Sequence, residues 1–381
     1  MVFHHVMETR TGHIKKKSKI QTLLLRLVRA DLVFWILPLL MVVLVIGTLA
    51  QAEMGLFLAQ QRYFASWIIW FGYLPFPGGH LLIGLFTLHL FLKFIVASEW
   101  RWVKAGIILS HAGALILLVG GLLTALLARE YYMVIPEGQT SPFLYDYHAR
   151  ELMIFEDDRM VGAIPFEQLQ IGDVPLDKSF ELSVMQRCTN CLIERREDSA
   201  QDFGDAPLHS MAAFMALDST APVREAEANI SGVTLQISGS DTDGIYLAFE
   251  AMPKPVEFQA GGQAYKILLG KRQTRLPFAI ELVDFKKESY PGEVMARAYS
   301  ADVIVHDGGL NWPAHIAMNK PLRYQGYTFY QSAFERNEQG EITILAVVEN
   351  KGRLFPYIGT IVITIGLLLH LILVLRRKEQ T

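Results

Sequence analysis

His111 is the residue whose type and position offer the most chemistry, because it interrupts a long apolar run from Ala105 to Ala128. In a helix that rises 1.5 Å per residue, it would lie about 9 Å beyond the start of that run. Ionisable groups at such a depth in a membrane are rare, and they usually face a bundle interior or a cavity. A neutral imidazole there could be an axial ligand of haem iron, or it could hydrogen-bond across a helix pair. The residues alone support the two hypotheses equally.

His370 lies near the end of another apolar run, Pro356–Leu375, at nearly the same depth as His111. A haem held between these two histidines is geometrically feasible, but an interfacial histidine near Arg376 is the favoured interpretation. Both histidines have glycine-containing helical faces, which allow another helix to approach closely. These faces consist of Gly106, Ser110 and Gly113 beside His111, and of Gly359, Ile363 and Gly366 beside His370.

His89 interrupts a third apolar run, Leu81–Ser98, and is another candidate ligand or structural hydrogen-bonding group. His80 lies at the start of that run. The histidines further along the chain are more typical of a protein surface than of a ligand set. They are His148, His209, His306 and His315.

Cys188 and Cys191, the two cysteines of the chain, form a CxxC motif. Residue 192 is leucine, so the CxxCH motif for covalent haem attachment is absent. Without other cysteines or a flanking βαβ pattern, neither a thiolate zinc site nor a thioredoxin fold is supported. A local disulfide is the favoured state on an oxidising side of a membrane, and a role in thiol exchange is the alternative. Such a role would imply a thioredoxin-like thiol reductase as a partner.

The composition indicates which elements position these residues. The chain has 381 residues, of which 51% are hydrophobic and 19% are charged, against about 25% charged in an ordinary soluble domain. This balance excludes a disordered chain, a coiled coil and a nucleic-acid binder. No Ser/His/Asp arrangement, P-loop or glycine-rich dinucleotide turn is present. The chain is therefore predicted to be an integral membrane protein with a sizeable soluble part.

Four apolar segments approach or exceed the roughly 20 residues that a membrane-spanning helix needs. They are Leu32–Ala50, Leu81–Ser98, Ala105–Ala128 and Pro356–Leu375. The first is too long for a cleaved signal peptide and is predicted to be a retained anchor.

Lysine and arginine are distributed unevenly between the two sides of these spans. The tail 1–31, the turn between the second and third spans with Lys93, and the tail 376–381 carry thirteen basic and four acidic residues, or +9. The remaining 22 basic and 34 acidic residues give −12. Because basic loops stay inside, both termini are predicted to be cytoplasmic at the inner membrane. Residues 129–355 then form one large extracytoplasmic loop.

The two outer segments differ in character. Residues 51–80 are rich in tryptophan, tyrosine and phenylalanine, which favours a helix lying in the membrane interface over a platform for a flat apolar ligand. Residues 129–355 contain regularly spaced strand-like runs, which predict a β-rich domain, either a sandwich or an open barrel. The predicted strands are 151–155, 233–238, 244–250, 265–269, 278–285, 301–305, 327–331 and 342–348. Residues 195–228 lack such a pattern, and a mobile insertion is predicted there.

Several motifs in a fixed order resemble the ResB-like family of cytochrome c biogenesis proteins. The resemblance covers roughly residues 29–140 and 276–370, and the CxxC motif is not part of it. The motifs are Ile107–Gly121, Tyr132–Gln139, Leu276–Phe278, Asp284-Phe285, Tyr290–Gly292, Met318–Leu322 and Tyr324–Ser332.

The resemblance implies a subunit of the System II pathway, which moves haem b across the membrane and attaches it to CxxCH thiols of apocytochrome c. Such a subunit works with a CcsA/ResC-type membrane protein that carries a tryptophan-rich outer motif. In the family, a histidine of the third span is a ligand of a membrane haem, and this position matches His111. This chain has no tryptophan-rich haem motif with flanking histidines, so it is predicted to have no synthase activity alone. Without the partner, His370 is the local candidate for a second ligand.

Two hypotheses from other functional classes remain. In one, the chain is a b-type electron-transfer subunit in which His111 and His370, or His89, hold one haem permanently. In the other, it is a membrane-anchored β-domain scaffold whose histidines are all structural.

Overall fold

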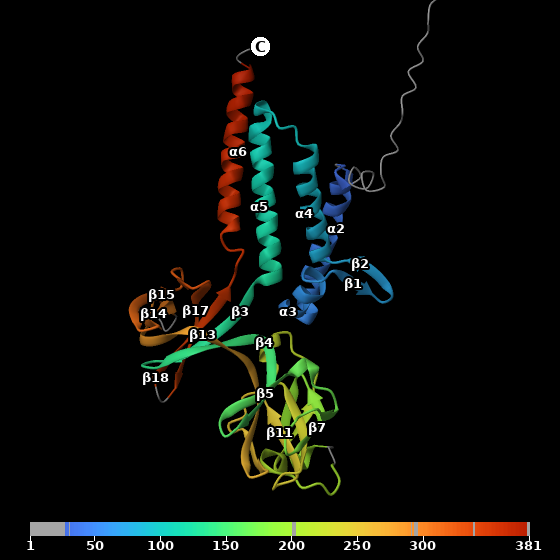
Figure 1. Cartoon of the computed structure of the whole chain (residues 1–381), viewed down its shortest axis with the longest axis vertical. Coiled ribbons are helices and arrows are strands. Elements are labelled where there is room, and N and C mark those ends of the chain that lie inside the picture. Colours follow the sequence, from blue (N-terminus) through green and yellow to red (C-terminus); the bar gives the residue numbers. More distant parts are fainter. Residues whose placement is uncertain are drawn as a thin grey trace, which may run out of the picture. The chain divides into compact units, whose positions relative to one another are not determined.

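The computed structural model describes residues 27–29, 31–199, 203–290, 292, 296–337 and 340–378 (Figure 1). Most of the predicted basic tail, residues 1–26 and 30, and residues 379–381 lie outside the described part. The chain divides into two units. We call the first, residues 1–47, 62–126 and 352–381, the helical unit, and the second, residues 48–61 and 127–351, the β unit.

Among the described residues, four helices are long and apolar enough to cross a membrane, as the hydropathy predicts. They are α2 (Asp31–Met54), α4 (Gly79–Leu92) with the π-helical turn η2 (Lys93–Ala97) that continues it, α5 (Ala105–Leu127) and α6 (Phe355–Lys378). A short 3₁₀ turn, η3 (Trp102–Lys104), leads into α5. The chain is a membrane protein.

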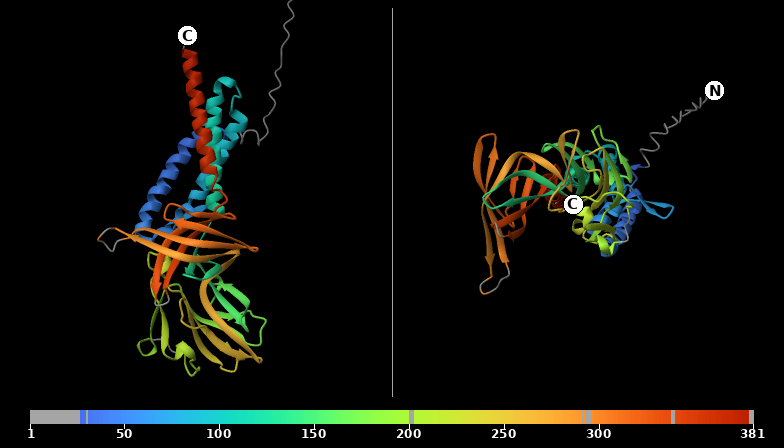
Figure 2. Two further views of the ribbon diagram at one scale, coloured as in Figure 1. Left: turned by 90° about the vertical axis from the view of Figure 1, so that its left-hand side faces the viewer. Right: turned by 90° about the horizontal axis from the view of Figure 1, so that it is seen from below.

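Helices α5 and α6 pack side by side through their glycine-containing faces (Figures 1 and 2). A Cβ atom at Gly366 would lie 2.6 Å from the backbone nitrogen of Ser110, and one at Gly113 would lie 2.8 Å from the carbonyl oxygen of Gly359. Glycine is therefore required at these positions, because the two backbones are in contact. This is the close approach of small residues that holds membrane helices together without a hydrophobic driving force.

The aromatic segment between the first two spans is not one interfacial helix. It begins with α3 (Leu56–Ala59) and the π-helical turn η1 (Gln60–Phe64), and then forms a hairpin of β1 (Ile68–Phe71) and β2 (Leu74–Pro77). The prediction of a helix is therefore wrong for the second half of the segment. Gly72 has φ 62°, and its positive φ allows the tight turn between the two strands.

The β unit contains one large antiparallel sheet of ten strands and two smaller sheets. The path of the large sheet is β15-β14-β13-β4-β3-β18-β17-β16, with β5 beside β4 and β12 beside β13. The four-stranded sheet has the order β11-β10-β7-β6, and β8 pairs with β9. No ladder joins the ends of a sheet among the described residues, so the predicted β-rich fold is confirmed, with sheets that are not closed into a barrel.

The bounds of the strands in the large sheet are β3 (Arg129–Pro136), β4 (Thr140–Glu156), β5 (Arg159–Pro165), β12 (Val256–Ala260), β13 (Gln263–Ser289), β14 (Ala296–Asp307), β15 (Leu310–Ala317), β16 (Leu322–Tyr324), β17 (Tyr327–Asn337) and β18 (Gly340–Glu349). Those of the smaller sheets are β6 (Gly172–Val174), β7 (Glu181–Cys188), β8 (Cys191–Arg195), β9 (Met215–Ser219), β10 (Gly232–Ser238) and β11 (Gly244–Phe249).

The long strand β13 contributes to two separate cores (Figure 2). Its first part, with Ile267 and Leu269, packs against the four-stranded sheet and forms a sandwich lobe. Its second part, with Phe278 and Leu282, packs inside the curled remainder of the large sheet and forms a curled-sheet lobe. Strands β4 and β13 thus run through both lobes and join them.

Candidate functional site

The imidazole of His111 is oriented by its own helix. Its Nδ1–H donates a hydrogen bond to the carbonyl oxygen of Ile107, one turn earlier, at 2.8 Å. A carbonyl oxygen only accepts, so Nδ1 carries a proton, and in a neutral imidazole Nε2 is then the nitrogen with the free lone pair. Metal-binding histidines commonly show this arrangement, in which one nitrogen is fixed by a carbonyl and the other is left for the metal. The side chain is exposed within the chain.

His111 lines a groove between α4 with η2 on one side and α5 on the other. The groove has a volume of about 180 Å³, below the roughly 300–1,000 Å³ of typical enclosed ligand pockets. Its lining residues are Leu90, Lys93, Phe94, Ser98, Glu99, Lys104, Ile107, Ile108 and His111. The π-helical turn that begins at Lys93 forms part of the wall, and such irregular turns occur frequently at functional sites. The groove offers one nitrogen ligand and one wall for a macrocycle, which fits half of a haem site.

His370 lies on a different side of α5 from this groove. The backbone of His370 packs on Gly106. Gly106 and Ser110 form the face of α5 that contacts α6. Because successive residues of a helix are rotated by about 100°, the side chain of His111 points well away from that face. The contact between the two helices leaves no gap for a porphyrin at this level. Nδ1 of His370 is buried and has no hydrogen-bond partner among the described residues. The structure therefore does not bring His111 and His370 together around one site.

His89 is buried in the helical unit. Its Nδ1–H donates to the carbonyl oxygen of Leu27 at 2.6 Å and so ties α4 to the segment before α2. The sequence analysis gave two roles for His89, a ligand or a structural hydrogen-bonding group, and this contact is of the second kind.

Cys188 and Cys191 are bonded to each other, as predicted for the favoured state. They close the turn between β7 and β8 and are 2% and 6% exposed. The turn is also held by Ser231, whose Oγ donates to the carbonyl oxygen of Thr189 at 3.0 Å. The sulfur atoms thus lie in a packed core, where a partner thiolate would need the turn to open. A role in thiol exchange stays a prediction without structural support.

We expect Cys188→Ser to leave cytochrome c maturation near the wild-type level. Loss of a disulfide that closes so short a loop costs about 2 kcal/mol by chain entropy, which a packed β lobe can absorb. The measurement is the amount of c-type cytochrome, by haem staining, in cells that carry the variant. Loss of maturation that added reductant restores would contradict this expectation and indicate thiol exchange.

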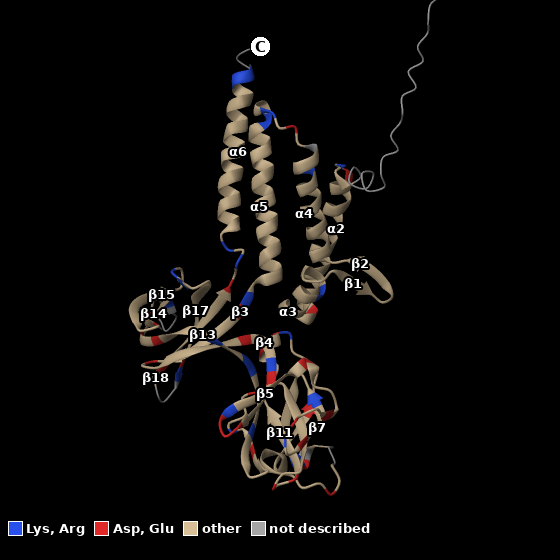
Figure 3. Cartoon of the chain, viewed as in Figure 1, with Lys and Arg blue, Asp and Glu red and all other residues tan. Residues whose placement is uncertain are grey.

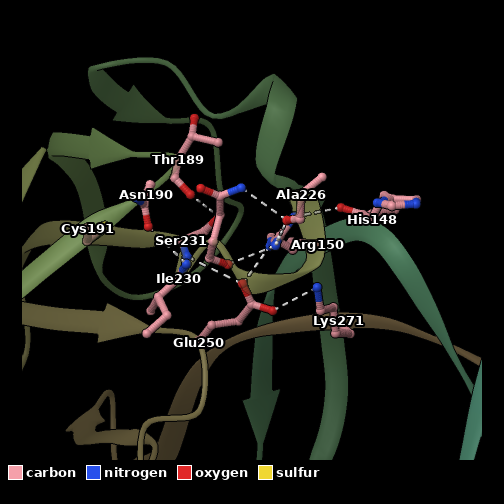
Figure 4. A network of polar contacts seen from close by, with 12 residues as sticks. His148, Arg150, Thr189, Asn190, Cys191, Ala226, Ile230, Ser231, Glu250 and Lys271 are labelled. Carbon is pink, nitrogen blue, oxygen red and sulfur yellow. Dashed lines mark hydrogen bonds and ion pairs between the residues drawn. The ribbon is translucent and has the colours of Figure 1, made fainter. Parts of the chain in front are cut away.

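A buried charged cluster that the sequence did not reveal links the end of β11 to strands β4 and β13 of the β unit (Figure 4). Arg150 of β4 and Lys271 of β13 are direct partners across the two strands, an arrangement that repels when the charges are alike. Glu250, just after β11, reduces this repulsion because its carboxylate pairs with both cations. Its Oε2 accepts from Arg150 Nε at 2.5 Å and its Oε1 lies 3.1 Å from Lys271 Nζ. Burial lowers the pKa of Lys271, while Glu250 opposes that shift.

His148 is not the surface histidine that the sequence suggested. Its ring stacks on Phe57 of α3 at 3.4 Å between centroids, and its Nδ1 is buried without a partner among the described residues. Burial lowers its pKa below the ordinary 6.5, although the carboxylate of Glu227, 3.4 Å from Nε2, opposes the shift. A cleft of about 460 Å³ lies nearby, lined in part by Tyr132, whose pKa burial raises to about 12.

The remaining histidines of the described residues have structural surroundings. His306 and His315 hydrogen-bond to the carboxylates of Glu281 and Asp302, and the Glu281 carboxylate raises the pKa of His306. Two more contact aromatic rings, His80 with Trp67 and His209 with Tyr246. In the part of the chain that the structure describes, no group of three or more histidine, cysteine, aspartate or glutamate residues could hold a metal ion.

Comparison with known proteins agrees with the motifs of the sequence. Residues 252–351, which run from just before β12 to just beyond β18, match the ResB-like family. Protein NrfI of Wolinella succinogenes is 31% identical to this chain over 105 residues, which are 27% of this chain and 11% of that protein. The match to the family does not include the third span, so it carries no information about His111. Residues 252–351 thus match the ResB-like family, which confirms the resemblance predicted from the motifs between Leu276 and Ser332.

Proposed function

We propose that this chain is the haem-handling subunit of a System II cytochrome c synthase and that His111 binds the haem iron within the membrane. The ResB-like match supports the pathway. The observation that carries the site is the exposed imidazole of His111, which lines a groove while its Nδ1 is fixed by the carbonyl oxygen of Ile107. A haem b bound here supplies the iron and the vinyl groups that are later joined to cysteine thiols.

The openness of the groove supports a division of labour between two proteins. His111 would hold the iron of a haem, and residues of α4, η2 and α5 would line one side of the bound group. A neutral or charged histidine exposed to lipid is unfavourable, so this face of α5 requires a cover. We infer that a CcsA/ResC-type membrane protein covers the face and supplies the second ligand, while the β unit receives apocytochrome c.

The charges of the helical unit support the predicted orientation. Lysine and arginine gather at the α4–α5 turn and at the end of α6 that leads to the C-terminus (Figure 3). Because basic segments stay on the cytoplasmic side, we propose that this end of the helices faces the cytoplasm of the inner membrane. The His111 groove then opens near the side on which haem is made, and the β unit is extracytoplasmic.

We expect His111→Ala to abolish c-type cytochrome formation while the protein still accumulates in the membrane. The side chain is exposed and its one hydrogen bond is within its own helix, so its loss removes a ligand without removing packing. The measurement is haem staining of c-type cytochromes beside an immunoblot of the membrane fraction.

A matched control is Leu126→Ala, at an exposed position near the other end of the same helix, which should mature cytochromes normally. Normal maturation in His111→Ala would remove His111 from the mechanism and favour the scaffold hypothesis. Haem retained by the purified chain alone, with both axial ligands internal, would favour the b-type electron-transfer hypothesis.

A further inference from the structure

The His111 groove has two chemically different ends. His111 lies on α5 with Ile107 and Ile108, and Lys104 precedes it by seven residues. Lys104 is the last residue of the 3₁₀ turn η3 that leads into α5, so it lies just before the start of that helix and lines the same groove as His111. Lys93, at the start of the π-helical turn, approaches the groove from the opposite wall.

Of the two ammonium groups that line this groove, only one is paired with a carboxylate among the described residues. Lys104 Nζ pairs with Glu99 Oε2 at 2.8 Å. Lys93 Nζ has no hydrogen bond or ion pair with the described residues, although it borders an apolar groove in the membrane-spanning unit. Three charged side chains line the groove, and they leave a net charge of +1. A lysine in such surroundings is expensive unless an anion or the membrane surface compensates it.

We propose that Lys93 and Lys104 bind the two propionate carboxylates of the haem whose iron His111 holds. This inference rests on the proposed function and adds the chemistry by which the groove recognises its cargo. A flat macrocycle with a metal at its centre and two carboxylates on one edge matches a groove with an imidazole toward one end and ammonium groups toward the other. Lys93 is the principal anchor because its charge is uncompensated, and Lys104 contributes by exchanging Glu99 for a carboxylate.

The test compares haem with its dimethyl ester, in which both carboxylates are blocked. The chain is co-purified with its CcsA/ResC-type partner in detergent, stripped of haem, and titrated with each compound while the absorption of the bound form is followed. Hydrogen bonds between charged groups are stronger than those between neutral ones, so Lys93→Gln should weaken haem binding at least about tenfold. It should leave binding of the ester unchanged. Glu99→Gln should strengthen binding of haem and not of the ester.

Arg101→Gln is the matched control, because Arg101 belongs to the same turn but lines the neighbouring groove of Trp100 and Trp102. It should leave the ratio of haem to ester affinity at the wild-type value. A wild-type ratio of haem to ester affinity in the double variant Lys93→Gln, Lys104→Gln would overturn the inference. Both compounds are titrated against the same sample, so a fraction of misfolded protein lowers the number of sites for both and does not change the ratio of the two affinities. If His111→Gly also bound haem as the wild type does, the proposed function itself would fail.

Discussion

Glu250→Ala is expected to lower the free energy of unfolding of the β unit by about 3–5 kcal/mol, because it leaves two buried cations without their carboxylate. The side chains of Arg150 and Glu250 are only 8% and 11% exposed. Arg150 also donates to the carbonyl oxygens of His148 at 2.9 Å and of Asn229 at 3.0 Å, so it cannot turn toward solvent without losing those bonds as well. The measurement is pulse proteolysis of the detergent-solubilised full chain in increasing urea.

Glu257→Ala is the matched control for this prediction. Glu257 also pairs with a lysine, Lys266, but at 3.9 Å and with 63% of its side chain exposed. Exposed pairs of this kind contribute about 0–1 kcal/mol, so the variant should unfold close to the wild-type midpoint. Equal midpoints for Glu250→Ala and Glu257→Ala would show that the buried carboxylate of Glu250 does not stabilise the β unit.

Gly366→Val is expected to separate α5 from α6. The added Cβ would lie 2.6 Å from the backbone nitrogen of Ser110, and backbone atoms cannot rotate away as a flexible side chain can. Overpacking usually costs about 1–3 kcal/mol and costs more where the neighbours cannot move. The expected result is a lower midpoint of unfolding for the solubilised chain in SDS, followed by circular dichroism at a helix band.

Gly121→Val provides the comparison, because a Cβ atom at Gly121 meets no atom within 4 Å. It should be neutral or slightly stabilising, since valine is a better helix former than glycine. The α5–α6 contact determines which face of α5 remains for His111, so Gly366→Val should also reduce cytochrome maturation. A stable, fully active Gly366→Val protein would contradict the packing of these helices through glycine.

The sequence predicted the helices well because membrane spans have a strong local signal. The glycine-containing faces of α5 and α6 could also be identified from spacing, and the structure places them against each other. Spacing could not show that this contact excludes a porphyrin between the two helices. Whether two such faces enclose a ligand or touch directly depends on tertiary packing.

The strands were predicted less completely. Residues 265–269 and 278–285 belong to one strand, β13, although Pro277 lies between them and would normally end a central strand. The pairing of β13 with β4 shifts between Arg275 and Ile280, so Pro277 lies where no ladder hydrogen bond is needed. Strand β9 lies within residues 195–228, where the sequence showed no strand pattern. Such irregular pairings depend on distant partners and leave no local signal.

The cluster of Arg150, Glu250 and Lys271 was missed for a similar reason. Its members are up to 121 residues apart, between Arg150 and Lys271, and each alone looks like an ordinary charged residue at the edge of a strand. One signal was available. Glu250 directly follows β11, whose six residues are all buried, so a carboxylate there is expected to need a buried partner.

The most direct test of the central claim is the visible spectrum of the chain co-purified with its CcsA/ResC-type partner, for the wild type and for His111→Gly, with and without imidazole. We predict a haem spectrum in the wild type, its loss in His111→Gly, and its return when imidazole fills the space of the missing side chain. Leu126→Gly should behave as the wild type does. An unchanged haem spectrum in His111→Gly without imidazole would contradict the assignment of His111 as the ligand of the iron.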